Sequence, residues 1–70
     1  MKKIYVALLG RNPSDNLMEK HKIVYVIAEN DDEAKVLAKE KWIAEKVHVD
    51  GVKSIEEIDG YKISVHNKEL

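Results

Sequence analysis

The chain has 70 residues, no cysteine and a formal net charge of -1 at pH 7. A domain this short buries only about 60 % of its unfolded surface, so its core is marginal. The lack of cysteine excludes disulfides and thiolate metal sites. Twelve Lys and Arg stand against thirteen Asp and Glu, which leaves no basic field of the kind that binds nucleic acid. We therefore expect one small domain over residues 1–70 that does not bind nucleic acid.

The apolar runs are short. The longest, residues 4–9 and 23–28, have six residues each, far fewer than a membrane span or a secretory signal needs. We expect a soluble cytoplasmic protein without a membrane partner. No sequence motif indicates a cofactor, and we expect none.

The same two runs predict the first two strands, because they are rich in β-branched residues and end at turn-forming residues. Neither run alternates between apolar and polar residues, so both faces of these strands are apolar. A single helix can cover only one face of a sheet. We therefore expect a homodimer, packed through the helix-free face or through an extended edge.

Residues 10–20 between the strands predict a long hairpin loop. Most hairpin loops have about two to five residues, and longer ones are often functional. Arg11 in this loop is a candidate for contacts with an anion or a protein. Leu17 and Met18 are candidates for protein contacts, or they simply lead into the second strand.

A helix is predicted from Asp31 to about Ile43. Asn30 is a suitable N-cap, and Glu33 lies at the position of a capping box. The helical spacing places an apolar stripe on one side, made of Ala34, Leu37, Ala38 and Trp42. Val36 and Ile43 would form a small outer patch if the helix persists to Ile43. The alternative is that the helix ends earlier and Ile43 lies in the connecting loop.

The last third predicts β structure. Val47-His48-Val49 alternates, and Asp50-Gly51 predicts a turn or a bulge. Asp59-Gly60 predicts a hairpin, since a type I′ turn needs positive φ at both central residues. A strict two-residue turn would pair polar with apolar residues there, so we expect a bulge or a longer loop. The three tyrosines, Tyr5, Tyr25 and Tyr61, are expected in a core that has no Phe.

The resulting class is α+β, with the order ββαββ and a mainly antiparallel sheet that has one helix packed on one face. From residues 4 to 63 the chain resembles the domain of unknown function 1543 family of small bacterial proteins. The resemblance rests on Leu8-Leu9-Gly10, Glu19-Lys20-His21, an acidic helix start leading to Trp42, His48-Val49-Asp50-Gly51 and Asp59-Gly60-Tyr61-Lys62-Ile63. Arg11 replaces a second glycine of the family pattern, and Lys22 replaces an acid. The resemblance implies no reaction.

Two short pairs could carry chemistry, Glu19 with His21 and His48 with Asp50. Residues i and i+2 of a strand share a face, so each pair could present an imidazole beside a carboxylate. Two such pairs brought together would suit a divalent metal or acid–base chemistry. The alternative is that Glu19 is solvated, that His21 begins a strand, that His48 lies on the solvent-exposed face opposite Val47 and Val49, and that Asp50 serves its turn. No phosphate loop, nucleophile elbow or other catalytic motif is present, so no catalytic residue is predicted.

The sequence therefore favours a non-enzymatic, homodimeric protein-interaction domain with a possible further protein partner. Its candidate contact residues are Val36, Ile43, Arg11, Leu17 and Met18. The alternatives are a small-ligand or divalent-metal domain that uses Glu19, His21, His48 and Asp50, or a phage-type inhibitor protein.

Overall fold

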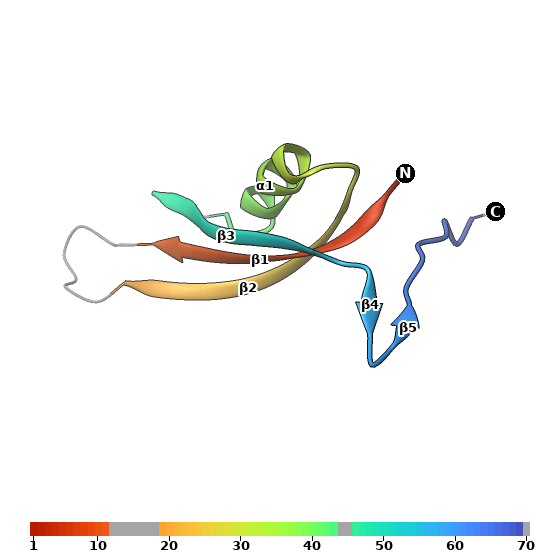
Figure 1. The fold of residues 1–70 in the computed structure, drawn as a ribbon. Coiled ribbons are helices and arrows are strands. Elements are labelled where there is room, and N and C mark those ends of the chain that lie inside the picture. Colours follow the sequence, from red (N-terminus) through yellow and green to blue (C-terminus); the bar gives the residue numbers. More distant parts are fainter. Residues whose placement is uncertain (12–18, 44–45, 70) are drawn as a thin grey trace.

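One helix packs on one face of a three-stranded antiparallel sheet in the computed structural model, which describes residues 1–11, 19–43 and 46–69 (Figure 1). The elements are β1 (Lys3–Arg11), β2 (Lys20–Ala28), α1 (Asp31–Glu40), β3 (Val47–Ile55), β4 (Glu57–Ile58) and β5 (Tyr61–Lys62). The strand order is β2-β1-β3, and β4 and β5 form a separate hairpin. The predicted α+β class and the order ββαββ are confirmed.

A bulge interrupts the pairing of the central strand β1 with β3. Leu8 lies opposite Gly51 and the next residue, Leu9, lies opposite Val49, so Asp50 is the extra residue. An extra residue reverses the alternation of side chains between the two faces. Val49 before the bulge and Val52 after it both pack against the core for this reason. Of the two predictions for Asp50-Gly51, the bulge is correct.

The core lies between the sheet and α1. It consists of residues from alternate positions of β1 and β2 together with two helix alanines, namely Tyr5, Ala7, Leu9, Val24, Val26, Ala28, Ala34 and Ala38. The alanines lie at i and i+4 of one helix face and lack bulk, which lets the helix approach the strands closely. Leu37 and Trp42 of the predicted stripe pack at the border of this core. The helix therefore covers one face of the sheet.

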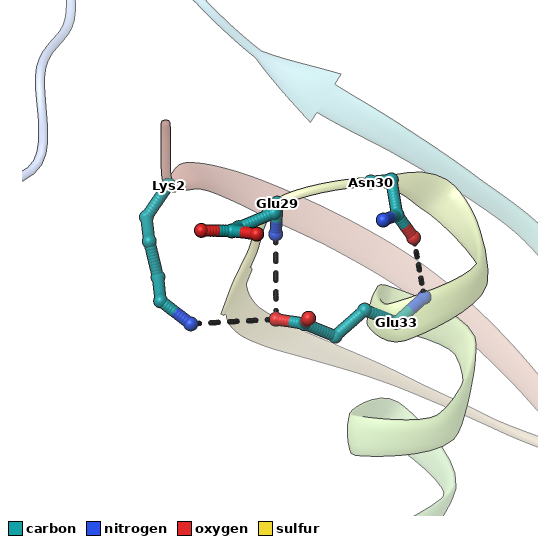
Figure 2. A network of polar contacts seen from close by, with 4 residues as sticks. All are labelled: Lys2, Glu29, Asn30 and Glu33. Carbon is teal, nitrogen blue, oxygen red and sulfur yellow. Dashed lines mark hydrogen bonds and ion pairs between the residues drawn. The ribbon is translucent and has the colours of Figure 1, made fainter.

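The start of α1 has the predicted cap (Figure 2). Asn30 Oδ1 accepts a hydrogen bond of 2.8 Å from the N–H of Glu33. The Glu33 carboxylate reaches back and accepts from the N–H of Glu29 at 3.4 Å, one residue before the cap, and it also pairs with Lys2 Nζ at 3.4 Å. These contacts satisfy N–H groups that have no partner within the helix.

The end of α1 differs from the prediction. The helix ends at Glu40, and the N–H of the C-cap residue Lys41 bonds Ala38 O at 3.1 Å. The predicted end at Ile43 was too long. Ile43 lies beyond the cap with 96 % of its surface exposed, as the alternative expected. In the described part of the chain, no helix has the length and apolar character to cross a bilayer.

The opposite face of the sheet has no helix. Large apolar side chains are exposed there, namely Leu8, Ile23, Tyr25 and Ile27. Tyr5 is buried as predicted, but Tyr25 is 58 % and Tyr61 is 75 % exposed. The prediction that these two fill the core was wrong, because Tyr25 points to the helix-free face and Tyr61 belongs to the outlying hairpin.

The β4–β5 hairpin has a strict two-residue turn. Asp59 and Gly60 have φ values of 53° and 83°, Ile58 pairs with Tyr61, and the N–H of Ile63 bonds Glu56 O at 2.9 Å. The expectation of a bulge or a longer loop was wrong. It assumed that one side of the hairpin is buried, whereas every residue of β4 and β5 is exposed, so the turn alone sets the register.

Candidate metal centre

His21 and His48 lie in one row across the sheet, with Gly10 between them. Gly10 of the central strand is paired with His21 of β2 on one side and with His48 of β3 on the other. Paired residues of neighbouring strands direct their side chains to the same face. The face here is the helix-free one, since Leu9, which precedes Gly10 in β1, is buried in the core.

Two carboxylates complete the group. Glu19 lies two residues before His21, and Asp50 is the bulge residue two positions after His48. The predicted spacing therefore places each acid on the face of its histidine. We refer to Glu19, His21, His48 and Asp50 as the His/acid cluster.

The cluster forms an alternating ring. His48 Nε2 lies 2.6 Å from Glu19 Oε1 and 3.0 Å from Asp50 Oδ1. His21 Nε2 lies 3.4 Å from Asp50 Oδ2 and 3.7 Å from Glu19 Oε2. Each carboxylate thus bridges both imidazoles and directs a different oxygen to each. Both histidines converge on the same two acids.

Gly10 provides the space for this ring. A Cβ at position 10 would collide with Glu19 Oε1, and it would lie 2.6 Å from His48 Nε2 and 2.7 Å from Asp50 Oδ2. No real Cβ tolerates such contacts. A glycine within a strand often marks a place where another group approaches the backbone closely. Here the approaching groups are the functional atoms of the cluster.

The cluster concentrates negative charge at a half-exposed site. The side chains of His21 and His48 are 47 % and 48 % exposed, and those of Glu19 and Asp50 are 37 % and 31 % exposed. Two carboxylates at this spacing repel each other unless a cation lies between them. Protons on the imidazoles or a bound metal ion can supply that positive charge. Ion pairs this exposed stabilise a fold by only about 0–1 kcal/mol each.

Three of the donor atoms lie close enough together to share one metal ion. Ligand bonds of about 2.0–2.1 Å in a tetrahedron place neighbouring donors about 3.3 Å apart. The imidazole-to-carboxylate distances of 2.6 to 3.7 Å span that value. One donor atom each from Glu19, His21 and Asp50 lies within 4.8 Å of the others. His48 contacts the same two carboxylates but lies outside this group of three.

The structure thus brings together all four residues that the sequence proposed for a metal. The protein-contact candidates lie elsewhere: Arg11 ends β1 in the row next to Gly10, and Val36 is 60 % exposed on the outer side of α1. Ile43 lies past the helix end, so the two do not share a helical face. Leu17 and Met18 lie outside the described residues. Protein binding by any of these residues stays a prediction.

The sequence reasoning missed Gly10. It treated this residue as the end of the first strand, whereas β1 continues through it to Arg11. The sequence offers one indication: Gly10 ends an apolar run, but it does not belong to an Asn-Gly or Asp-Gly pair, which would indicate a turn. The sequence could not show that both histidines would pair with it.

Residues 16–65 match the model of the family described as Domain of Unknown Function (DUF1543). The match includes all four residues of the His/acid cluster, and it begins after β1, so Gly10 lies outside it. No curated protein and no solved structure matches the chain significantly.

Proposed function

We propose that this chain, which belongs to the Domain of Unknown Function (DUF1543) family, binds one divalent transition-metal ion through the His/acid cluster. The observation that supports the proposal most is the alternating ring, in which two imidazoles and two carboxylates converge over Gly10. Nε2 of each histidine and one oxygen of each acid are the proposed ligands.

The donor set favours zinc. Two nitrogen and two oxygen donors suit Zn²⁺, Ni²⁺ and Co²⁺, whereas Mg²⁺ and Ca²⁺ prefer oxygen ligands alone. The affinity order for first-row ions places zinc above manganese at such a site. We therefore expect zinc and nickel to bind more tightly than manganese, and magnesium to bind weakest.

The position of the cluster supports a binding role over a structural one. Its ion pairs are exposed and contribute little to the fold. The core lies on the other face of the sheet and contains none of these four residues. A metal ion would neutralise the two carboxylates without any rearrangement of the core.

Calorimetric titration with zinc tests the proposal, with magnesium as the comparison ion. We expect one zinc per chain, and His21→Ala or His48→Ala should weaken binding by at least about tenfold. His66→Ala is the matched control, since His66 is exposed and contacts Ser64 Oγ at 3.1 Å, outside the cluster. If zinc gives no heat, or if His66→Ala weakens binding as much as the other two, the proposal fails.

A protein-interaction role through Val36 on the outer side of α1 and Ile43 beyond its end is the second candidate. The support is the exposure of Val36 at 60 % and of Ile43 at 96 %, since both are apolar side chains. A phage-type inhibitor would be one form of this role.

A further inference from the structure

The helix-free face of the sheet and the β4–β5 hairpin are two surfaces on which large apolar side chains are exposed. Ile23 and Tyr25 on the face are 60 % and 58 % exposed, and Ile58 and Tyr61 on the hairpin are 52 % and 75 % exposed. We call the hairpin, residues 56–63, the arm. The arm projects from the sheet on the side opposite α1 (Figure 1).

We propose that a second copy of this chain covers both surfaces, with the arm of each copy lying on the helix-free face of the other. A two-fold dimer needs a surface that complements itself. One chain here carries both an apolar arm and an apolar face, so two copies satisfy each other reciprocally. The inference does not depend on the proposed metal.

The arm itself is the first reason. An isolated two-stranded hairpin is only marginally stable in water. The arm follows directly on β3, and Glu56 at its start pairs with Lys3 Nζ of β1 at 3.4 Å. Among the described helices and strands, β4 and β5 have their main contacts with each other. Its exposed pair Ile58 and Tyr61 lie opposite each other, so they offer one joint apolar surface. A partner that packs on this pair would stabilise the turn and both strands.

The shape of the chain is the second reason. A compact chain of this length has a radius of gyration of about 11 Å. This molecule has a radius of gyration of 14.1 Å and extents of 45 × 27 × 18 Å. This elongated shape leaves both the arm and the helix-free face accessible to a second copy.

The available area is the third reason. The exposed apolar residues of the two surfaces are Leu8, Ile23, Tyr25, Ile27, Ile58 and Tyr61. A fully exposed large side chain has about 200 Å² of accessible surface, so these six side chains together expose roughly 650 Å². A stable interface needs about 800 Å² per partner. These six side chains thus supply most of what a dimer requires.

Sedimentation velocity in the presence of EDTA tests the dimer without any contribution from a metal. At about 100 μM, a dimer with micromolar affinity is almost fully formed. We therefore expect a sedimenting species with twice the chain mass of 8.0 kDa. Ile58→Asp with Tyr61→Asp should give the mass of one chain with an unchanged circular dichroism spectrum, because the arm lies outside the core. Val36→Lys is the control, since Val36 is as exposed as Ile23 but lies on the helix, and it should leave the dimer intact.

A mass of one chain for the unaltered protein would overturn the proposal, and so would a dimer that survives both arm substitutions. A second measurement locates the contact. In a mixture of isotope-labelled and unlabelled chains, isotope-filtered NOEs should connect Ile58 of one copy with Ile23 or Tyr25 of the other. A dimer without such NOEs would contradict the reciprocal arrangement.

Discussion

His21 and His48 flank Gly10 from opposite sides of the same cross-strand row, and both imidazoles reach the same pair of carboxylates. The residues are 27 positions apart in the chain. The strand order β2-β1-β3 brings them together, since it places the two histidine-bearing strands on either side of β1. The His/acid cluster therefore depends on this register and on the absence of a side chain at Gly10.

Substitution Gly10→Ala should weaken metal binding with little loss of stability. The new Cβ would occupy the space of Glu19 Oε1, His48 Nε2 and Asp50 Oδ2. All three atoms end partly exposed side chains that can turn into solvent, so the fold can adapt while the cluster is dispersed. We expect zinc affinity to fall by at least about tenfold, measured by calorimetry.

Gly51→Ala is the matched control for that substitution. Gly51 lies in the same sheet, opposite Leu8, but a Cβ there meets nothing within 4 Å. Zinc affinity should stay unchanged in this variant. Equal losses at both glycines would mean that general damage to the sheet, rather than the space above Gly10, governs binding.

Zinc affinity should fall as the pH is lowered. Imidazole and carboxylate bind a metal only after losing their protons, so metal and protons compete for the same atoms of His21, His48, Glu19 and Asp50. We expect a loss of at least about tenfold once protons occupy the two imidazoles. The measurement is a calorimetric titration at several pH values, and a flat profile would exclude imidazole ligands.

The sequence predicted the chemistry of this group better than its geometry. The i, i+2 spacing correctly indicated that Glu19 shares a face with His21 and that His48 shares a face with Asp50. It could not show that the two pairs meet, because that requires the strand order and the register. The bulge at Asp50 was one of two predicted options, and only the pairing with β1 distinguishes a bulge from a turn.

Substitution Leu9→Ala should destabilise the domain strongly. Leu9 is fully buried and is the largest such side chain among the described residues. Loss of a buried leucine costs about 2–5 kcal/mol, which is comparable to the whole stability of a domain this small. Urea denaturation followed by circular dichroism should show a chain that is largely unfolded or has a much lower midpoint. An unchanged midpoint would contradict the described core.

The N-cap offers a smaller and more local test. Asn30→Ala removes the hydrogen bond to the N–H of Glu33 and should cost about 1 kcal/mol in the free energy of unfolding. Asn67→Ala is the matched control, because Asn67 Oδ1 accepts from the N–H of Glu69 near the chain end, away from the core. Equal effects of the two substitutions in urea denaturation would argue against the capping role.

The outer surface of α1 tests the second candidate function. Val36→Lys combined with Ile43→Lys should leave the urea midpoint unchanged, since both side chains are exposed. The same double variant should lose any protein partner that binds this surface, as measured by pull-down from native lysate. If the variant unfolds, the two residues belong to the core; if a partner is retained in full, it binds elsewhere.

The helix-free face marks a second limit of the sequence. The unbroken apolar runs correctly indicated two apolar faces, and the covering of one face by α1 followed from the helix stripe. Tyr25 was misplaced because a strand that is apolar on both sides does not say which side the helix takes. The register of β1 with β2 places Val24 and Val26 towards α1 and leaves Tyr25 outside.

The most direct test of the metal site is the imidazole ¹⁵N spectrum of the protein with and without one equivalent of zinc. We expect the Nε2 resonances of His21 and His48 to shift together and to saturate at one zinc per chain, while those of His66 stay in place. If His21 and His48 keep their metal-free resonances, or if all three histidines shift alike without saturation, the His/acid cluster is not a metal site.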